Sequence, residues 1–286
     1  YMNKTEFSEE EWLFEIAPKD KFFSLHLKEV WRYRDLLMLF VKRDVVTVYK
    51  QTILGPLWYL IQPLFTSIIF TIIFNNVAGI STGATPAFLF NLGGVMVWNY
   101  FTSCLNDTSD TFKKNASIFG KVYFPRLIMP LTIVISNLMK FGVQFLLFVG
   151  FVIYFVAQDQ IAPKSWIFLT PVIVALMALI AMGIGLILSA MTTKYKDLNQ
   201  LIGFGVQLFM YASPVIYPSS SVPAAYQWIV ELNPLGGLFD YMRYAYLGAG
   251  TFVMADLIYP GVFALVILIF GILVFNKTQK TFMDTV

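Results

Sequence analysis

The sequence predicts an all-α integral membrane protein with six transmembrane helices, and composition and charge placement lead to this prediction. Hydrophobic residues make up 58% of the 286 residues, charged residues only 13%, and the mean hydropathy is +0.69. Soluble domains carry about 25% charged residues, so this chain lacks the polar surface of a soluble enzyme. Hydrocarbon is the available environment for its excess apolar surface, and the charge-free stretches have the length of membrane spans.

The six spans are placed where charges are missing. No charged residue lies between Lys50 and Asp107, which leaves room for two spans at about 1.5 Å per residue and a turn from Asn75 to Pro86. Lys140 is the single charge between Leu127 and Gln158, and two further charge-free stretches follow. The predicted spans are 57–77, 87–106, 127–157, 166–191, 199–217 and 257–275, and the last offers Gly261 and Gly271 for close helix contact.

The basic residues orient these spans. All of the 20 Lys and Arg residues except Lys140, Lys164 and Arg243 fall on one side of the predicted membrane. By the positive-inside rule, both termini are therefore cytoplasmic. We expect a cytoplasmic segment at 1–28 without a cleavable signal, a six-span domain at 53–276 and a cytoplasmic tail at 277–286.

Residues 29–52 predict an amphipathic helix lying in the inner membrane interface. One face carries apolar residues: Val30, Tyr33, Leu37, Val41 and Val48. The opposite stripe carries the cations Arg32, Arg43 and Lys50, whereas Arg34 and Asp44 interrupt the apolar side. We expect the cations to meet lipid phosphates rather than to bind a specific ligand.

Two connections are too long or too apolar to be simple loops. A helix is predicted over 107–119, capped by Asp107 or Thr108 and ending near Gly120, with apolar side chains exposed either to a cytoplasmic partner or to the membrane surface. On the outer side, 224–232 and 235–247 predict two short re-entrant helices with aromatic faces. Such a pair over a pathway would form an exit gate.

Several kinds of chemistry are missing from the sequence. A single cysteine, Cys104, and a single histidine, His26, argue against a disulfide, a metal site and histidine-based catalysis. Gly120-Lys121 lacks the rest of a phosphate-binding loop, so we do not expect this chain to hydrolyse ATP. Lys140, the only charge clearly inside a span, is simplest to interpret as snorkelling or pairing with a carbonyl, although it could touch an anionic substrate.

Four segments carry a resemblance to a known family. They are KRDVVTVYKQTILGPLWYLIQP, KVYFPR, KYKDLNQ, and SPVIYP followed by LNPLGGLFDYMR. In order and spacing, from about residue 28 to 276, the chain resembles the membrane subunit of ABC-2 type polysaccharide exporters. The resemblance implies a homodimer enclosing a tunnel in the bacterial cytoplasmic (inner) membrane. It further implies two copies of a separate cytoplasmic ATPase that binds ATP and Mg, and a lipid-linked O antigen, capsule or teichoic acid as cargo.

The resemblance also implies roles for residues. Coupling to the ATPase and the cytoplasmic gate would involve Asp110, Phe112, Lys113, Lys114, Phe119, Lys194, Lys196 and Asp197. The periplasmic gate would involve Tyr226, Trp228, Phe239, Tyr241 and Arg243.

Aromatic rings suit a tunnel because they contact the apolar CH faces of sugars. The candidates for such a lining are Trp58, Tyr59, Phe65, Phe204, Phe209 and Tyr211. Aromatic belts at the membrane interfaces are the preferred explanation for Trp98, Tyr100, Tyr154 and Trp166.

Two alternatives stay open. An ABC-2 exporter of a drug or lipid would have the same fold and a different cargo. An integral-membrane enzyme that modifies a glycolipid would need clustered external acids, whereas Asp159, Glu231, Asp240 and Asp256 are scattered in the sequence. We expect no cofactor or metal bound to this chain and no nucleic-acid partner.

Overall fold

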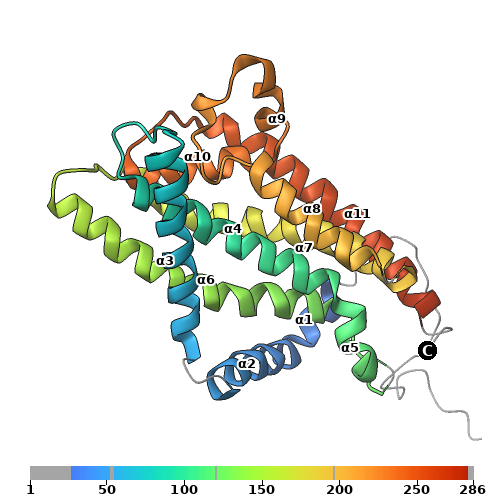
Figure 1. Ribbon diagram of the computed structural model, residues 1–286. Helices are drawn as coiled ribbons and strands as arrows, with labels where there is room; N and C mark the ends of the chain where they lie inside the picture. Colours follow the sequence, from blue (N-terminus) through green and yellow to red (C-terminus); the bar gives the residue numbers. More distant parts are fainter. Residues whose placement is uncertain (1–26, 52–54, 120, 196, 283–286) are drawn as a thin grey trace, which may run out of the picture.

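The computed structural model describes residues 27–51, 55–119, 121–195 and 197–282, and over these ranges it contains helices and no strand (Figure 1). The predicted all-α class is confirmed. The α-helices are α1 Leu27–Arg32, α2 Arg34–Gln51, α3 Trp58–Phe70, α4 Ala87–Ser109, α5 Thr111–Phe119, α6 Ile128–Ala157, α7 Thr170–Lys194, α8 Leu198–Ala212, α9 Gln227–Glu231, α10 Gly236–Leu247 and α11 Ile258–Phe282.

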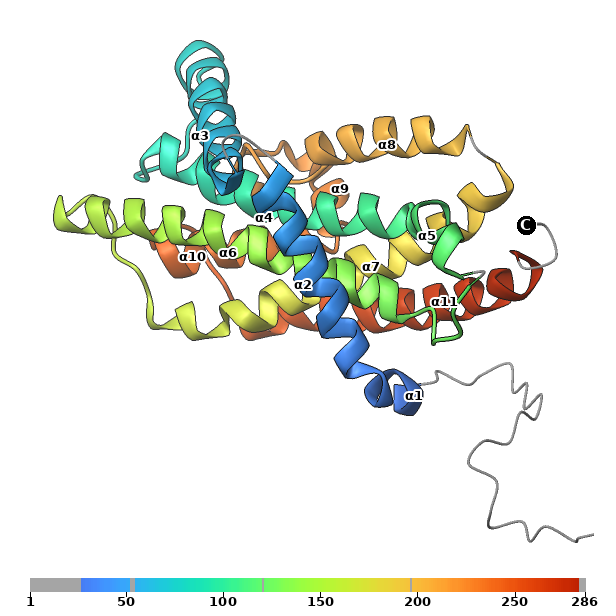
Figure 2. The same cartoon turned by 90° about the horizontal axis from the view of Figure 1, so that it is seen from below.

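The long helices stack in three layers (Figure 2). α4 and α6 form the middle layer, α3 and α8 lie along one side of α4, and α7 and α11 lie along the other. α4 contacts α3, α6, α7 and α8, and most of its residues are buried. The main apolar core therefore surrounds α4.

Four helical segments are long and apolar enough to cross a membrane, by length and composition: Trp58–Val77, Ile128–Ala157, Ser165–Lys194 and Met254–Gln279. The first continues α3 through a π-helix at Thr71–Val77, and the last two include 3-10 turns at Ser165–Leu169 and Met254–Leu257. They correspond to predicted spans one, three, four and six.

α4 and α8, at predicted spans two and five, do not meet this criterion. α4 carries buried polar residues, and one of them is bound by neighbouring segments: the Asn91 side-chain nitrogen donates to Thr71 Oγ1 at 3.0 Å and to Asn75 Oδ1 at 2.8 Å. A helix that is covered by protein needs no lipid-compatible surface, so its hydropathy is low. α8 has only 15 residues.

Several predicted boundaries were wrong. The fifth span was predicted to reach residue 217, but α8 ends at Ala212 because Ser213 precedes Pro214 and takes the extended conformation that a following proline favours. α11 continues to Phe282, into the predicted tail at 277–286, whose cytoplasmic position stays a prediction. Asn75, predicted to start a turn, lies within the π-helix.

The predicted helix start at Asp107 or Thr108 was also wrong. Both residues lie inside α4, which continues to Ser109. The chain bends at Asp110, whose φ of −90° and ψ of 5° leave the helical region, and α5 starts at Thr111. The predicted end at Gly120 lies outside the described residues, as do Lys196 and residues 1–26.

α2 packs its apolar side on the chain itself. Leu37, Phe40 and Val41 are buried in a second cluster with residues of α5, α6, α7 and α11. The two charges that interrupt this face each have an opposite charge nearby: Arg34 Nε lies 4.0 Å from Asp35, and Asp44 lies 2.7 Å from Arg43.

Glycines bring the backbones of α7 and α11 into direct contact. A Cβ added at Gly271 would lie 2.5 Å from the Gly183 carbonyl oxygen, and one at Gly183 would lie 2.8 Å from the Ile267 carbonyl carbon. Gly271 therefore makes the close helix contact expected from the sequence. Gly261 has no heavy atom within 4 Å of such a Cβ, so it makes no similar contact among the described residues.

Gly271→Val should lower the melting temperature of the protein, because the new side chain forces α7 and α11 apart at a cost of about 1–3 kcal/mol or more. Gly261→Val is the matched control on the same helix. Unfolding can be followed with a thiol-reactive dye, since Cys104 is the only cysteine and is fully buried. Equal melting temperatures for the two variants would contradict this packing.

Candidate functional site

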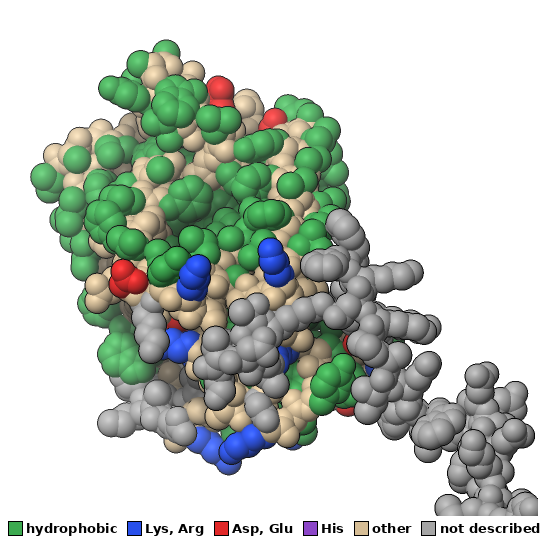
Figure 3. All heavy atoms as spheres, turned by 90° about the vertical axis from the view of Figure 1, so that its right-hand side faces the viewer, with side chains coloured by type: hydrophobic (Ala, Val, Ile, Leu, Met, Phe, Trp, Pro, Cys, Tyr) green, Lys and Arg blue, Asp and Glu red, His purple; other side chains and the backbone are tan. Residues whose placement is uncertain are grey.

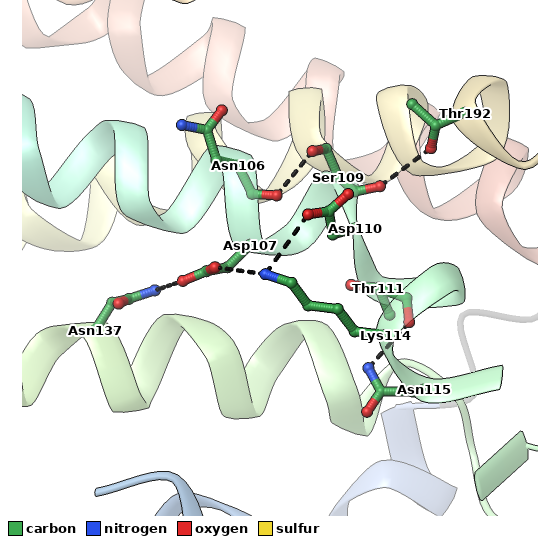
Figure 4. A network of polar contacts seen from close by, with 9 residues as sticks. All are labelled: Asn106, Asp107, Ser109, Asp110, Thr111, Lys114, Asn115, Asn137 and Thr192. Carbon is green, nitrogen blue, oxygen red and sulfur yellow. Dashed lines mark hydrogen bonds and ion pairs between the residues drawn. The ribbon is translucent and has the colours of Figure 1, made fainter. Parts of the chain in front are cut away.

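The end of α4, the start of α5 and the middle of α6 meet in a group of charged and amide side chains that we call the polar junction: Asp107, Asp110, Lys114 and Asn137 (Figure 4). Lys114 Nζ lies 3.0 Å from Asp107 Oδ1 and 3.5 Å from Asp110 Oδ2. Asn137 Nδ2 donates to Asp107 Oδ2 at 3.2 Å. One lysine of α5 thus reaches back across the bend, and the carboxylate that it meets is also held by α6.

The arrangement shifts the pKa of Lys114. Burial alone would lower the pKa of Lys114, but the Asp107 and Asp110 carboxylates outweigh burial and raise it above its ordinary value. The two carboxylates therefore stabilise the charged ammonium group, which connects α5 to the end of α4 across the bend.

The apolar side of α5 is covered by the rest of the chain. Phe112 is buried and stacks on Phe275 of α11, with ring centroids 4.4 Å apart. Phe119 is buried between Phe112 and Phe124, and the Arg126 guanidinium lies 5.2 Å from its ring centroid. The expectation that these side chains are exposed to a partner or to the membrane surface was therefore wrong, because the bend at Asp110 turns them inward.

The exposed surface near α5 consists of other residues. Lys113 is exposed on α5, and Val122 and Tyr123 after it expose 57% and 87% of their surface. Helical periodicity does not predict the exposure of the last two, because they lie outside any helix.

The second predicted coupling segment lies beside the first. Thr192 Oγ1, near the end of α7, donates to the Ser109 carbonyl oxygen at 3.2 Å, which connects the ends of α7 and α4 (Figure 4). Lys194 is exposed with its ammonium 5.3 Å from the Tyr195 ring centroid, and Asp197 is exposed just before α8. The structure therefore brings the end of α4, which leads into the first segment, beside the end of α7, which leads into the second, although the two are far apart in the sequence.

The three interface cations, Arg32 on α1 and Arg43 and Lys50 on α2, are all exposed. Arg43 also pairs with Asp44 and lies 4.8 Å from the Phe40 ring centroid. Their contact with lipid phosphates stays a prediction.

At the opposite end of α4, the predicted gate residues separate into two groups. Tyr226 and Trp228, on the turn Ala224–Tyr226 and on α9, expose 59% and 58% of their surface. Phe239, Tyr241 and Arg243 of α10 are buried. The Tyr241 hydroxyl donates to the Trp166 carbonyl oxygen at 2.6 Å, which ties α10 to the start of the fourth predicted span.

Arg243 forms a clamp between α10 and the segment after α8. Its Nη2 donates to the carbonyl oxygens of Pro214 and Val215, the second at 3.0 Å. Its Nη1 lies 3.5 Å from Asp240, which in turn accepts from Ser219 at 2.7 Å. The guanidinium also lies 3.9 Å from the ring centroid of Phe90 on α4.

A glycine of α4 makes room for the clamped segment. A Cβ at Gly94 would lie 2.3 Å from the Val215 carbonyl oxygen, so no side chain fits there. The segment after α8 therefore rests directly on the backbone of α4.

The predicted tunnel residues lie on α3 and α8, on the same side of α4 (Figure 2). Trp58, Phe65, Phe204 and Tyr211 are exposed. Tyr59 is half-buried, with Lys140 Nζ 5.9 Å from its ring centroid, and Phe209 packs on Trp98 and Phe101 of α4.

The aromatic-belt interpretation was wrong for two residues. Trp98 and Tyr100 expose only 5% and 4% of their surface because α4 is interior to the bundle. Tyr154 is exposed and Trp166 is half-buried.

Comparison with known proteins identifies the family. Residues 35–247 match the family described as ABC-2 type transporter, and the chain belongs to that family. It is 29% identical over 252 residues to the O-antigen export system permease protein RfbA of Klebsiella pneumoniae, covering 87% of this chain and 94% of the relative. It is 21% identical over 247 residues to the polysialic acid transport protein KpsM of Escherichia coli, covering 85% of this chain and 93% of the relative. It is 24% identical over 199 residues to the inner membrane transport permease YadH of Escherichia coli K12, covering 66% of this chain and 75% of the relative.

Arg243→Leu should destabilise the protein by about 1–3 kcal/mol or more, because it leaves the Pro214 and Val215 carbonyl oxygens without their buried donor and the half-buried Asp240 carboxylate without its cation. Lys164→Leu serves as the control, since Lys164 is exposed and outside the clamp. Thermal unfolding of both variants in detergent measures the difference. If Arg243→Leu unfolded no earlier than Lys164→Leu, the clamp would contribute nothing to the fold.

Proposed function

We propose that this chain is the membrane subunit of an ATP-driven exporter that moves a lipid-linked polysaccharide across the bacterial inner membrane. The observation that carries the proposal is the similarity to permeases named for O-antigen export and polysialic acid transport, which spans most of this chain and of each relative. Two copies of the chain would enclose the tunnel, and two copies of a separate cytoplasmic ATPase would supply the energy by hydrolysing ATP with Mg.

The proposed topology has six spans with both termini in the cytoplasm. α4 and α8 would be spans two and five, shielded from lipid by α3, α6, α7 and a second copy. The distribution of charge supports this orientation: on the face in Figure 3, apolar side chains cover the upper part, and Lys and Arg side chains gather below, toward the end where α2 and α5 lie.

The exposed faces of α3 and α8 would form the tunnel wall. On α8, residues spaced by three or four expose their side chains along one face: Leu201, Phe204, Leu208 and Tyr211. On α3, Trp58 and Phe65 line a hollow of about 540 Å³ together with Gln62 and Thr66. Because both helices lie on one side of α4, a second copy facing that side would place both sets of rings along a shared path. Rings facing the path would contact the CH faces of a moving sugar chain without fixing its sequence.

α5 and the segment before α8 would receive the motion of the ATPase. Lys113, Lys194 and Asp197 are exposed there and could contact an ATPase subunit. The polar junction would carry a displacement of α5 to α4 and α6, since Lys114 and Asn137 bind the same carboxylate.

Both alternative functions make different demands on the structure. An enzyme would need free external acids, but Asp240 is engaged by Ser219 and Arg243, and Asp256 accepts from the Val253 backbone N–H at 3.0 Å. Export of a drug or lipid in place of a polysaccharide remains the alternative. The similarity to the transport permease YadH, whose name states no cargo, is consistent with either cargo.

Reconstituted into lipid vesicles with its ATPase subunit, the chain should translocate a lipid-linked polysaccharide only when ATP and Mg are present. Alone in the same vesicles it should translocate nothing and hydrolyse no ATP. A fluorescent label on the polysaccharide and release of phosphate measure the two activities. Transport by the chain alone would refute the proposal, and efflux of a labelled phospholipid in place of the polysaccharide would favour the alternative cargo.

Phe204→Ala and Tyr211→Ala should each slow polysaccharide export by about 2- to 10-fold, as expected for loss of one ring contact worth about 0.5–1.5 kcal/mol. The melting temperature should change little, because both side chains are exposed. Phe270→Ala is the matched control, since Phe270 is equally exposed but lies on α11, away from α3 and α8. If all three variants exported the polysaccharide equally fast, Phe204 and Tyr211 would not line the tunnel.

A further inference from the structure

A polar groove runs inside the single subunit, from the polar junction along α6 toward α3. It consists of two adjoining hollows of about 470 Å³ and about 200 Å³ that share Tyr59, Asn137 and Lys140. The larger hollow lies between α2, α5 and α6, and the smaller one lies between α3, α4 and α6. We refer to both together as the polar groove.

Lys140 supplies the unneutralised charge of this groove. It lies roughly 18 Å along α6 from the first residue of that helix, at about 1.5 Å per residue, well inside a predicted span. The other charges that line the groove pair with each other, Arg43 with Asp44 and Lys114 with Asp107. Lys140 forms no ion pair with any described residue, and its ammonium lies 5.9 Å from the Tyr59 ring centroid. A lysine at this depth is costly unless it faces a polar space, and such residues mark ligand paths.

Buried acceptors that lack a partner line the same groove. The side-chain oxygens of Ser136, Asn137 and Gln144 form no hydrogen bond, although these residues expose only 8%, 2% and 8% of their surface. With Lys140 they occupy one side of α6, at positions spaced by one, three and four residues. Buried acceptors without a donor are unfavourable, so the groove is suited to a ligand that brings hydroxyl groups.

Rings complete the lining. Tyr59, Tyr100 and Phe141 line the smaller hollow beside the amides of Gln62 and Asn99. Amide groups that bind hydroxyls, rings that pack on CH faces and one cation together define the chemistry of a sugar that carries a negative charge.

We propose that the polar groove binds a sugar with an anionic substituent, with Lys140 pairing with the anion and the acceptors of Ser136, Asn137 and Gln144 receiving sugar hydroxyls. The anion would be either the phosphate that joins a sugar to its lipid or the carboxylate of an acidic sugar. This inference rests on the proposed function and adds a cargo-selecting site that lies within each subunit rather than between two.

Binding can be measured by saturation-transfer NMR on the chain and its ATPase subunit in lipid nanodiscs. The ligands are glucose 1-phosphate, glucuronate and uncharged glucose. At least one of the two anions should bind more tightly than glucose, and Lys140→Gln should weaken that binding by about tenfold or more while leaving glucose unchanged. Preference for glucose 1-phosphate would assign the groove to the lipid-linked end, and preference for glucuronate would assign it to an acidic polymer.

Two variants separate binding from folding. Lys164→Gln should bind like the unaltered chain, although Lys164 also lies over a tyrosine ring, 5.0 Å from the centroid of Tyr244. Gln144→Met should weaken binding of every sugar without lowering the melting temperature, because it removes an acceptor that has no partner in the fold.

Measuring export with the same complexes separates this inference from the proposed function. Unaltered anion binding by Lys140→Gln, or a preference for glucose, would overturn the groove assignment even where export proceeds. Anion binding that depends on Lys140 would support it even if the exported cargo were not a polysaccharide.

Discussion

The burial of α4 among other helices is the constraint on which the rest of the structure depends. Because protein and not lipid surrounds it, α4 can carry Asn91 and a pair of glycines, one of which lets the segment after α8 rest on its backbone. Its two ends hold the two groups of charged residues, the polar junction and, through Phe90, the Arg243 clamp. A rigid interior helix thus joins the end with α5 to the end with α10.

This arrangement has a mechanical meaning. Interiors are close-packed, so a push on α5 is transmitted as a shift of whole helices and is not absorbed locally. α5 is fixed to α11 through Phe112 and Phe275 and to α4 through Lys114. α7 and α11 touch backbone to backbone at Gly183 and Gly271, so no side chain separates them there. α3 and α8 are less enclosed, since only two residues of α3 and none of α8 are buried.

Much of the fold could be predicted from the sequence, because the absence of charge locates apolar helices and proline and glycine locate their ends. Helical periodicity shows that one face of a helix is apolar but does not show what covers that face. For this reason Phe112 and Phe119 were expected to be exposed, and Trp98 and Tyr100 were assigned to an aromatic belt at the membrane interface. The break at Asp110 could not be foreseen, since it depends on Lys114 closing the bend. The polar side of α6 could have been found, because Ser136, Lys140 and Gln144 recur at helical spacing in a mostly apolar segment.

The single cysteine has a practical consequence for any study of assembly. Cys104 is fully buried in α4, so the folded chain offers no native thiol to reagents in solution. Cysteines placed singly along the outer faces of α3 and α8 would then be the only sites for spin labels or oxidative cross-linking. Separations between the two copies of the proposed dimer, and any change in them on adding ATP and the ATPase subunit, would become measurable without first deleting a natural residue.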